Sequence, residues 1–438
     1  MKGRGFGFGR CRHVARALIV ACAYGIATAA FDASVVHADG VATRLGRTEW
    51  LDVGIVIDAE RVRVAVGPTS GEAVRGAPEV DNVPARSSLV AWIGGGRILL
   101  ALEGASGARL NEPVVADDTV FVGGPETDEV TVNGKRYRGG AKLFVSPRGR
   151  ITAANRVAVE PYLRGVLPHE IGKLDAATLE AGKAQAVAAR TYTLSYVGRR
   201  FEEGFDLYDS VEDQVYAGIA SETPFTDRAV AETRGVVVLH DGSYIRANYY
   251  STCGGATANV EDIWPDPPFP WLRQVEDRDV HDAWCKDSRH FRWTETWTGA
   301  EVLSNLNRYG PEQSGIAPPP GGWKELRDVR VNSRSPSGRV RELVFDTEKG
   351  DVVVWADKTR WVLRRPQSAG GSILRSSLFK LAVRKDGRGR VTQVVASGGG
   401  NGHGAGMCQV GALAQARAGR AFGDILHFYY ADVEIVHL

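Results

Sequence analysis

The chain has 438 residues, and 43% of them are hydrophobic. A chain of this length and apolar content can bury one or more hydrophobic cores, which excludes disorder over its whole length. Its formal net charge is only +2. Because a protein so close to neutral has no general attraction to polyanions, nucleic acid is excluded as a partner.

The N-terminus has the pattern of a secretory signal peptide. Five basic residues and no acidic residue lie in positions 2–16, an apolar run follows at 17–30, and small residues suited to cleavage occupy 36–38. We therefore expect residues 1–38 to be a signal peptide, and the protein to be exported to the periplasm or cell envelope. An uncleaved anchor is the alternative, although the run is short for a membrane span. Cleavage removes five basic residues and one acidic residue, which changes the net charge from +2 to −2.

Residues 45–129 have the pattern of a β-rich N-terminal region. Short apolar segments alternate with Gly, Pro and Asp, and strands are predicted at 51–57, 61–66 and 97–102. The segment 71–87 is rich in Gly, Pro and charge and is predicted to be a loop. In the next segment, 130–137, the Asn133-Gly134 step predicts a two-residue hairpin turn.

Helical periodicity begins after Glu160, and the longest helix is expected from a cap at Asp175 to a stop at Gly198. The stripe that should face the core contains two cations, Lys183 and Arg190. A buried cation is costly unless it is paired, so these two side chains should meet either substrate or a protein carboxylate. A salt-bridged core helix is the alternative interpretation.

Glu170 is the first candidate catalytic residue. It lies between Leu167 and Ile171, and such apolar surroundings raise the pKa of a carboxyl group by desolvation. A carboxylic acid that stays protonated near neutral pH is the group that glycosidic cleavage requires. A purely structural role for this glutamate is the alternative.

Two further segments carry candidate binding residues. The run 248–255 contains Tyr250 and Ser251, which offer a stacking surface and a hydroxyl beside flexible glycines. The glycine-rich run 402–412 should expose His403 and Gln409 at a strand-to-helix junction. A thiol nucleophile formed by Cys408 with His403 is an alternative function for this second segment.

The cysteines outside the leader are Cys253, Cys285 and Cys408. In an exported protein a disulfide between Cys253 and Cys285 is the simpler prediction, with no cofactor. The alternative is a zinc ion held by those two cysteines together with His281 and His290.

The C-terminal part adds a β-rich segment at 326–397 and two short helices, near 409–418 and 421–430. Because strands and helices do not alternate regularly, the predicted class is α+β rather than a doubly wound sheet.

The separated motifs resemble, in order, those of the stage II sporulation protein D (SpoIID) and amidase enhancer LytB family. The resemblance covers residues 130–438, which we therefore expect to form a SpoIID/LytB-like domain with a long helix and a substrate groove. The motifs that carry it are Tyr137-Arg-Gly-Gly, Val157-Ala-Val-Glu-Pro-Tyr-Leu-Arg-Gly-Val-Leu-Pro-His-Glu170, Lys183-Ala-Gln-Ala-Val-Ala-Ala-Arg-Thr191, Asp213-Gln-Val-Tyr216, Tyr249-Tyr-Ser-Thr-Cys-Gly-Gly255, Glu261-Asp-Ile-Trp264 and Gly402-His-Gly-Ala-Gly-Met407.

The resemblance implies a peptidoglycan lytic transglycosylase that cleaves denuded glycan strands, with Glu170 as its single general acid and base. It also implies a partnership with a cell-wall amidase, and zinc is bound through Cys and His in some relatives. The substrate-binding positions that it implies are Lys183, Gln185, Arg190, Gln214, Tyr250, Ser251, His403 and Gln409. Two other functions remain open: a hydrolase with Asp213, Glu261 or Asp262 as second carboxylate, and a non-catalytic glycan-binding amidase enhancer.

Overall fold

The computed structural model describes residues 50–67, 71–124, 127–367 and 370–438. The predicted signal peptide at 1–38 lies outside these residues. Helices and strands are mixed without regular alternation, which confirms the α+β class. Within the described ranges, no helix has the length and apolar character needed to cross a membrane.

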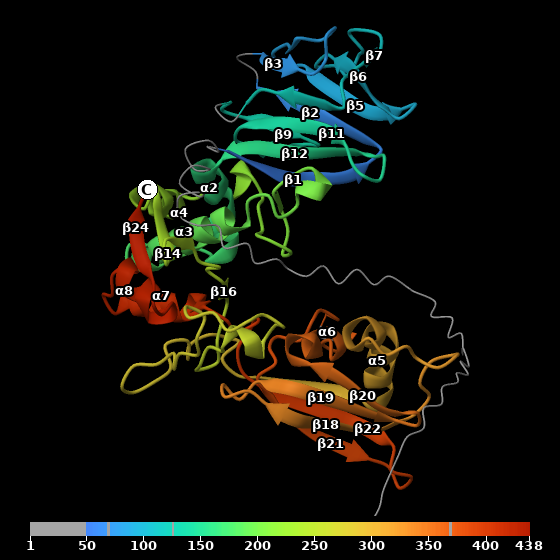
Figure 1. Ribbon diagram of the computed structural model, residues 1–438, viewed down its shortest axis with the longest axis vertical. Coiled ribbons are helices and arrows are strands. Elements are labelled where there is room, and N and C mark those ends of the chain that lie inside the picture. The colour runs from blue at the N-terminus through green and yellow to red at the C-terminus, as the bar shows by residue number, and fades with distance from the viewer. Residues whose placement is uncertain (1–49, 68–70, 125–126, 368–369) are drawn as a thin grey trace, which may run out of the picture. The chain divides into compact units, whose positions relative to one another are not determined.

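A seven-stranded sheet and a six-stranded sheet form the β-rich N-terminal region in the described part of the chain. Their strand orders are β13-β1-β12-β11-β8-β3-β4 and β10-β9-β2-β5-β6-β7. The side chains between them share one hydrophobic core, so the sheets pack face to face (Figure 1). The strands are β1 (Trp50–Ala59), β2 (Arg61–Val66), β3 (Glu72–Arg75), β4 (Asn82–Val83), β5 (Ser88–Gly94), β6 (Arg97–Glu103), β7 (Val114–Val115), β8 (Thr119–Val122), β9 (Val130–Val132), β10 (Lys135–Tyr137), β11 (Gly140–Val145), β12 (Ile151–Ala158) and β13 (Leu207–Tyr208).

The predicted hairpin is confirmed. Lys135 pairs with Val132, and Asn133 and Gly134 both have positive φ, as a type I′ turn requires. The prediction of a loop at 71–87 is wrong in part, because β3 and β4 form there and pair with each other. These strands are very short, and short paired segments within a Gly- and Pro-rich stretch give little alternation to detect.

Strands from both sides of residue 130 share these sheets. In the seven-stranded sheet β1 pairs with β12, and in the six-stranded sheet β2 pairs with β9. The boundary predicted at residue 130 therefore falls inside this pair of sheets.

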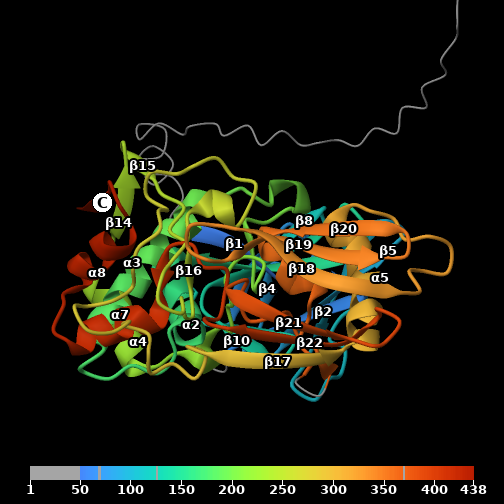
Figure 2. The same ribbon diagram turned by 90° about the horizontal axis from the view of Figure 1, so that it is seen from below.

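The helices of the middle and the C-terminus build a second core. Its members come from α3, from the β14 and β16 segments and from the α7–α8 pair, and Figures 1 and 2 show α7 and α8 beside α3. The elements are α2 (Val159–Glu170), α3 (Leu179–Tyr196), α4 (Pro224–Glu232), β14 (Val236–His240), β15 (Ser243–Tyr244), β16 (Tyr249–Tyr250), β23 (Met407–Cys408), α7 (Gln409–Arg417), α8 (Phe422–Tyr429) and β24 (Glu434–His437).

The long predicted helix ends close to the expected place but begins three residues late, with its N-cap at Thr178 instead of Asp175. Asp175 and Thr178 hydrogen-bond each other through side chain and main chain, at 2.9 and 3.0 Å, and so close a turn before α3 instead of capping its first turn. Glu170 is the last residue of α2, a helix that lies before α3 and continues through Pro168.

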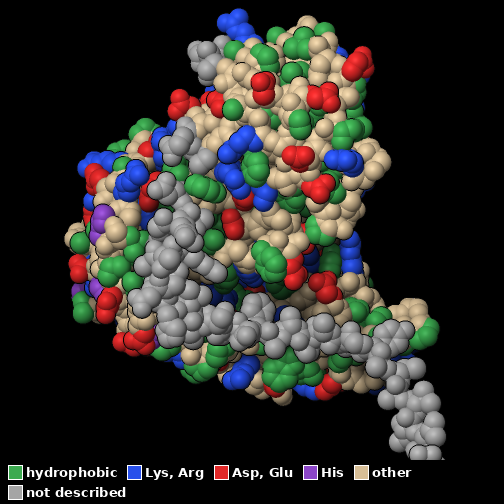
Figure 3. Space-filling model, turned by 45° about the horizontal axis from the view of Figure 1, so that its top comes forward, with side chains coloured by type: hydrophobic (Ala, Val, Ile, Leu, Met, Phe, Trp, Pro, Cys, Tyr) green, Lys and Arg blue, Asp and Glu red, His purple; other side chains and the backbone are tan. Residues whose placement is uncertain are grey.

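A third core belongs to residues 293–398, where two three-stranded sheets pack with α5 and α6 (Figure 1). Strand order is β17-β22-β21 in one sheet and β18-β19-β20 in the other. The bounds are β17 (Trp293–Thr298), α5 (Gly299–Ser314), β18 (Leu326–Arg334), β19 (Val340–Thr347), β20 (Gly350–Trp355), α6 (Thr359–Val362), β21 (Phe379–Lys385) and β22 (Val391–Gly398). On the face shown in Figure 3, basic and acidic side chains are interspersed.

Candidate functional site

Glu170 lies at the C-terminal end of α2 and lines a pocket of about 950 Å³. Burial raises the pKa of its carboxyl group to about 7, against weaker opposing hydrogen bonds from the Val215 main chain and from Gln409. The Val215 N–H donates to Oε1 at 3.4 Å. A helix C-terminus carries partial negative charge, which further disfavours the ionised carboxylate. The position therefore suits a group that both gives and takes a proton near neutral pH.

Several predicted binding residues share this pocket with Glu170. Tyr250, Ser251, His403 and Gln409 all contribute to its lining, although they come from segments about 80 to 240 residues away in the sequence. The parallel pairing of β16 with β23 brings the two motifs together, because Tyr250 lies opposite Cys408 in that pair.

An aromatic wall runs along the pocket. The ring of His403 lies 5.0 Å from that of Tyr250 and 4.8 Å from that of Trp264, between centroids. Apolar ring faces of this kind are the surfaces on which sugar rings stack in other proteins. Tyr192 and Tyr196 of α3 add further aromatic surface to the lining.

His403 has both ring nitrogens engaged. Nδ1 accepts a hydrogen bond from the Ala405 N–H at 3.2 Å, so Nε2 carries the proton and donates to the Tyr249 carbonyl at 3.0 Å. Burial lowers the pKa of this imidazole to about 4, which keeps it neutral. The alternative of a Cys408–His403 nucleophile is therefore not supported, because the imidazole has no free nitrogen to accept a thiol proton.

Arginines form a second group in the lining, and sequence reasoning missed them. They come from five separate segments, and no local pattern marks them. Those that line the pocket, among the residues described, are Arg199, Arg246, Arg289, Arg360, Arg365 and Arg375. Most also pair with carboxylates, for example Arg246 with Asp266 at 2.5 Å and Arg365 with Glu295 at 2.8 Å.

The candidate second carboxylates are engaged elsewhere. Asp213 does line the pocket, but it pairs with Arg199 and Arg200 and accepts the Tyr208 N–H at 2.9 Å. Glu261 receives two hydrogen bonds from Arg273, at 2.8 and 2.6 Å. Asp262 is buried and accepts from Asn259. Neither Glu261 nor Asp262 belongs to the pocket lining.

Comparison with known proteins identifies similarity in the same part of the chain. Residues 147–240 match the family model of the stage II sporulation protein (SpoIID), and this segment contains Glu170. The stage II sporulation protein D of Bacillus subtilis is 26% identical over 335 residues, which cover 71% of this chain and 85% of that protein. The amidase enhancer of the same organism is 27% identical over 292 residues.

The chain is therefore similar to proteins of the SpoIID/LytB family, through a SpoIID segment at 147–240 and through alignments that cover 61 to 71% of its length. The alignment with the amidase enhancer covers 61% of this chain but only 39% of that relative. An uncharacterized protein of Brachyspira hyodysenteriae is 27% identical over 340 residues, which cover 77% of this chain and 82% of that relative. Residues 279–406, which include the third core, match a domain of unknown function (DUF8618).

The cations of the SpoIID/LytB helix motif lie outside the pocket lining, contrary to the predicted substrate-binding role. Arg190 is 1% exposed and forms a bidentate pair with Glu160, at 2.7 Å for each bond. Lys183 pairs with Glu180 and Glu232, both at 2.7 Å. Both side chains are paired with protein carboxylates, as expected from the alternative interpretation in which this helix is a salt-bridged core helix.

The two glutamines of the SpoIID/LytB motifs lie behind the pocket rather than in its lining. Gln185 is buried and accepts a hydrogen bond from Gln409 at 3.3 Å. Gln214 is also buried, where its amide donates to the Tyr249 hydroxyl at 2.7 Å and its oxygen accepts from Tyr162 at 3.1 Å. Both glutamines are placed to orient neighbours of Glu170, not to contact a ligand.

The cysteine predictions also need correction. Cys253, Cys285 and Cys408 are free thiols, and the Sγ atoms of Cys253 and Cys285 lie 3.3 Å apart, beyond the length of about 2.05 Å of a disulfide. The two histidines of the predicted zinc set do not join them: His281 is exposed and His290 lines the pocket. Asp277 and Cys408 lie beside the two cysteines instead.

Proposed function

We propose that the protein is an exported peptidoglycan lytic transglycosylase in which Glu170 acts as the single general acid and base. The observation that carries the proposal is the position of this glutamate, which lies in a pocket large enough for sugar rings with its pKa raised to about 7. The family relatives named for sporulation and for enhancing an amidase agree with an action on the cell wall.

The reaction needs only one carboxyl group. Protonated Glu170 donates its proton to the glycosidic oxygen as the bond to the muramic acid C1 breaks. The C6 hydroxyl of the same muramic acid then attacks C1 and gives its proton to the Glu170 carboxylate. The products are a strand with a 1,6-anhydro end and a strand with a free hydroxyl, and the enzyme returns to its starting protonation state.

The pocket lining supports a denuded glycan as the substrate. Muramic acid without its stem peptide has a free lactyl carboxylate, and guanidinium groups bind carboxylates well. The arginines of the pocket supply such groups, and Trp264 and Tyr250 supply ring faces for the sugars. A cell-wall amidase, which removes stem peptides, is therefore the partner that would act before this protein.

Product analysis tests the proposal. Glycan strands stripped by an amidase are incubated with the purified protein, and the products are identified by mass spectrometry. We expect 1,6-anhydro ends, each lighter by one water than a reducing end, and no turnover by Glu170→Gln. Lys183→Met is the matched control, because Lys183 lies outside the pocket lining. Reducing ends would instead indicate a hydrolase.

A non-catalytic amidase enhancer is the second candidate, favoured by the relative of that name. It predicts glycan binding by the wild-type protein without any new chain ends, together with faster release of stem peptides by an added amidase. Turnover that depends on Glu170 would exclude it.

A further inference from the structure

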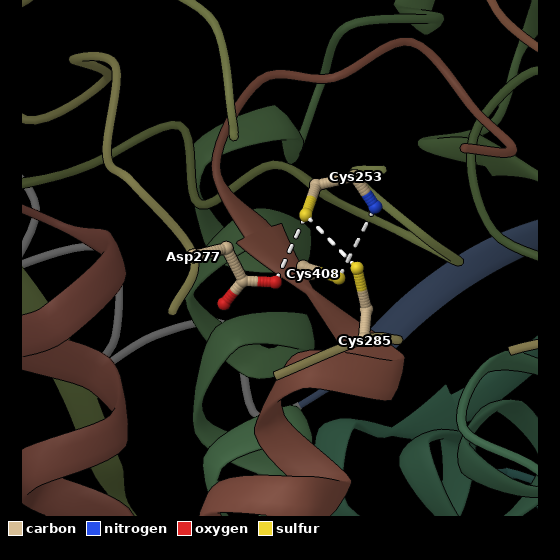
Figure 4. A group of neighbouring side chains, drawn as sticks. All are labelled: Cys253, Asp277, Cys285 and Cys408. Atoms are coloured by element: carbon tan, nitrogen blue, oxygen red, sulfur yellow. Dashed lines mark hydrogen bonds between the residues drawn. The ribbon is translucent and has the colours of Figure 1, made fainter. Parts of the chain in front are cut away.

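Cysteine and aspartate side chains from distant segments meet in the second core (Figure 4). Cys253 follows β16, Asp277 and Cys285 precede β17, and Cys408 ends β23. All of them are buried, and their donor atoms lie within 4.8 Å of one another. This group, called here the thiol cluster, shares Cys253 and Cys285 with the zinc set predicted from the sequence but has Asp277 and Cys408 in place of the two histidines.

The spacing of the thiol cluster suits a single metal ion. Tetrahedral zinc, about 2.3 Å from each thiolate, places its sulfur ligands about 3.8 Å apart. In the structure Asp277 Oδ2 lies 2.9 Å from Cys253 Sγ, and the Sγ atoms of Cys253 and Cys285 lie 3.3 Å apart. Both separations are shorter than those of a tetrahedral site, and no two donor atoms of the cluster lie more than 4.8 Å apart, so a bound zinc ion needs only small shifts of these side chains.

We propose that Cys253, Asp277, Cys285 and Cys408 bind one structural zinc ion. Thiolates select zinc over the hard cations Mg²⁺ and Ca²⁺, and carboxylate oxygens are also ligands of zinc in proteins. Burial of all the ligands leaves no open coordination position for water or substrate, which is typical of a structural rather than a catalytic zinc. This inference does not depend on the proposed glycan chemistry.

Hydrogen bonds from neighbouring groups orient the side chains of the thiol cluster, as hydrogen bonds orient the ligands in known metal sites. The Tyr429 hydroxyl donates to Asp277 Oδ1 at 2.6 Å, which leaves Oδ2 toward the sulfurs, and Gln415 holds Tyr429 in turn at 3.0 Å. Main-chain N–H groups point at the sulfurs: that of Cys253 lies 3.2 Å from Cys408 Sγ, and that of Gly255 lies 3.2 Å from Cys253 Sγ. Such donors stabilise thiolates over thiols.

A disulfide explains less of this arrangement. If Cys253 and Cys285 were bonded, Cys408 would remain as a buried thiol and Asp277 as a buried carboxyl group without a cation beside it. Buried charges in proteins are paired or coordinate metals. A zinc ion uses both groups and accounts for the odd number of thiols.

The zinc ion would also support the pocket. Ser251 precedes Cys253 by two residues and Gln409 directly follows Cys408, and both line the pocket with Glu170. A metal that joins Cys253 to Cys408 therefore fixes two parts of the pocket wall against each other.

Metal analysis of the full-length chain, purified without chelators, tests the proposal. We expect about one zinc per chain, released when the thiols are modified with a mercurial. Replacement of zinc by cobalt should give the thiolate-to-cobalt charge-transfer absorption, a result that needs no variant. Protein that contains no zinc and takes up neither zinc nor cobalt would overturn the proposal, as would peptide mapping that finds Cys253 linked to Cys285.

Variants identify the ligands. Cys285→Ser and Asp277→Asn should each lower zinc affinity at least about tenfold, with folding checked by circular dichroism. The matched control is the double variant His281→Ala, His290→Ala, which should keep its zinc. Loss of zinc in this control but not in Cys285→Ser or Asp277→Asn would show that the histidines hold the metal and would overturn the proposed ligand set.

Discussion

Arg190 donates two hydrogen bonds to Glu160, at 2.7 Å each, and so joins α3 to the start of α2. The same guanidinium donates to the Val236 carbonyl at 3.0 Å and thereby reaches β14. A fully buried charge that links three elements is a structural residue, in spite of its place in a motif implied to bind substrate.

Removal of one partner of this pair should destabilise the fold strongly. We expect Arg190→Met to lower the free energy of unfolding by about 3 to 5 kcal/mol, because Glu160 is left as an unpaired, largely buried carboxylate. The double variant with Glu160→Gln should lose less than the sum of the single variants. Denaturant titration measures both effects, and additive losses would contradict the pairing.

Glu170→Gln should stabilise the protein while it abolishes turnover. Burial raises the pKa of Glu170 from 4.5 to about 7, so ionisation in the folded state is unfavourable. The folded state binds the proton more tightly than the unfolded state, and stability is therefore lost as pH rises from about 4.5 to 7. At pH 8 the variant should exceed the wild type by about 1 to 3 kcal/mol, and at pH 4 by little. Thermal unfolding at both pH values checks this.

The rate of glycan cleavage should fall as pH rises through about 7, since the first step needs protonated Glu170. His403 should not contribute to this limb, because burial keeps its pKa near 4. This fall in rate is measured from a profile of kcat/KM against pH, with denuded glycan strands as substrate. A rate that stays constant to pH 9 would rule out a protonated Glu170 as the acid.

Lys183→Met should leave glycan binding and turnover unchanged. Its ammonium group pairs with Glu180 and Glu232 near the surface, and such partly exposed pairs contribute about 1 kcal/mol or less to stability. Trp264→Ala, which removes part of the aromatic wall, should weaken binding severalfold. Equal loss of binding in both folded variants would restore the substrate-binding role of Lys183.

Gly406→Ala should be far more damaging than Gly419→Ala. Both glycines have positive φ, at 79° and 85°, so both substitutions introduce backbone strain of about 1 kcal/mol. At Gly406 the new Cβ would also lie 2.0 Å from the Asn248 carbonyl oxygen, whereas at Gly419 it meets open space. Thermal unfolding of the two variants under the same conditions isolates the effect of this contact. Similar unfolding midpoints would contradict the prediction that the contact at Gly406 destabilises the fold.

Local patterns predicted much of the fold. The β2 strand and the Asn133-Gly134 hairpin appear where alternation and turn chemistry placed them. Helix α5 was missed, although Thr298 and Glu301 form a capping box at its start. Its interior contains Gly310 and Pro311, which weaken the helical pattern.

The candidate site was only partly predictable. The sequence indicated Glu170 and Tyr250 because each lies in a distinctive local motif, and the structure places both in one pocket. It could not separate a cation that meets substrate from one that meets Glu160, since the partner lies 30 residues away and on another helix. Asp277 was missed for the same reason, as only the folded chain brings it to the cysteines.

The pairing of β14 with β24 places the last residues of the chain against the end of the family-matched segment. A nascent polypeptide that has emerged from the ribosome only as far as residue 400 has the Glu170 helix. It still lacks strand β24, helices α7 and α8, and the part of the pocket lining that contains Gln409. The pocket can therefore assemble only after residues 407–437 have been synthesised, and contacts across such long stretches of sequence make that step slow.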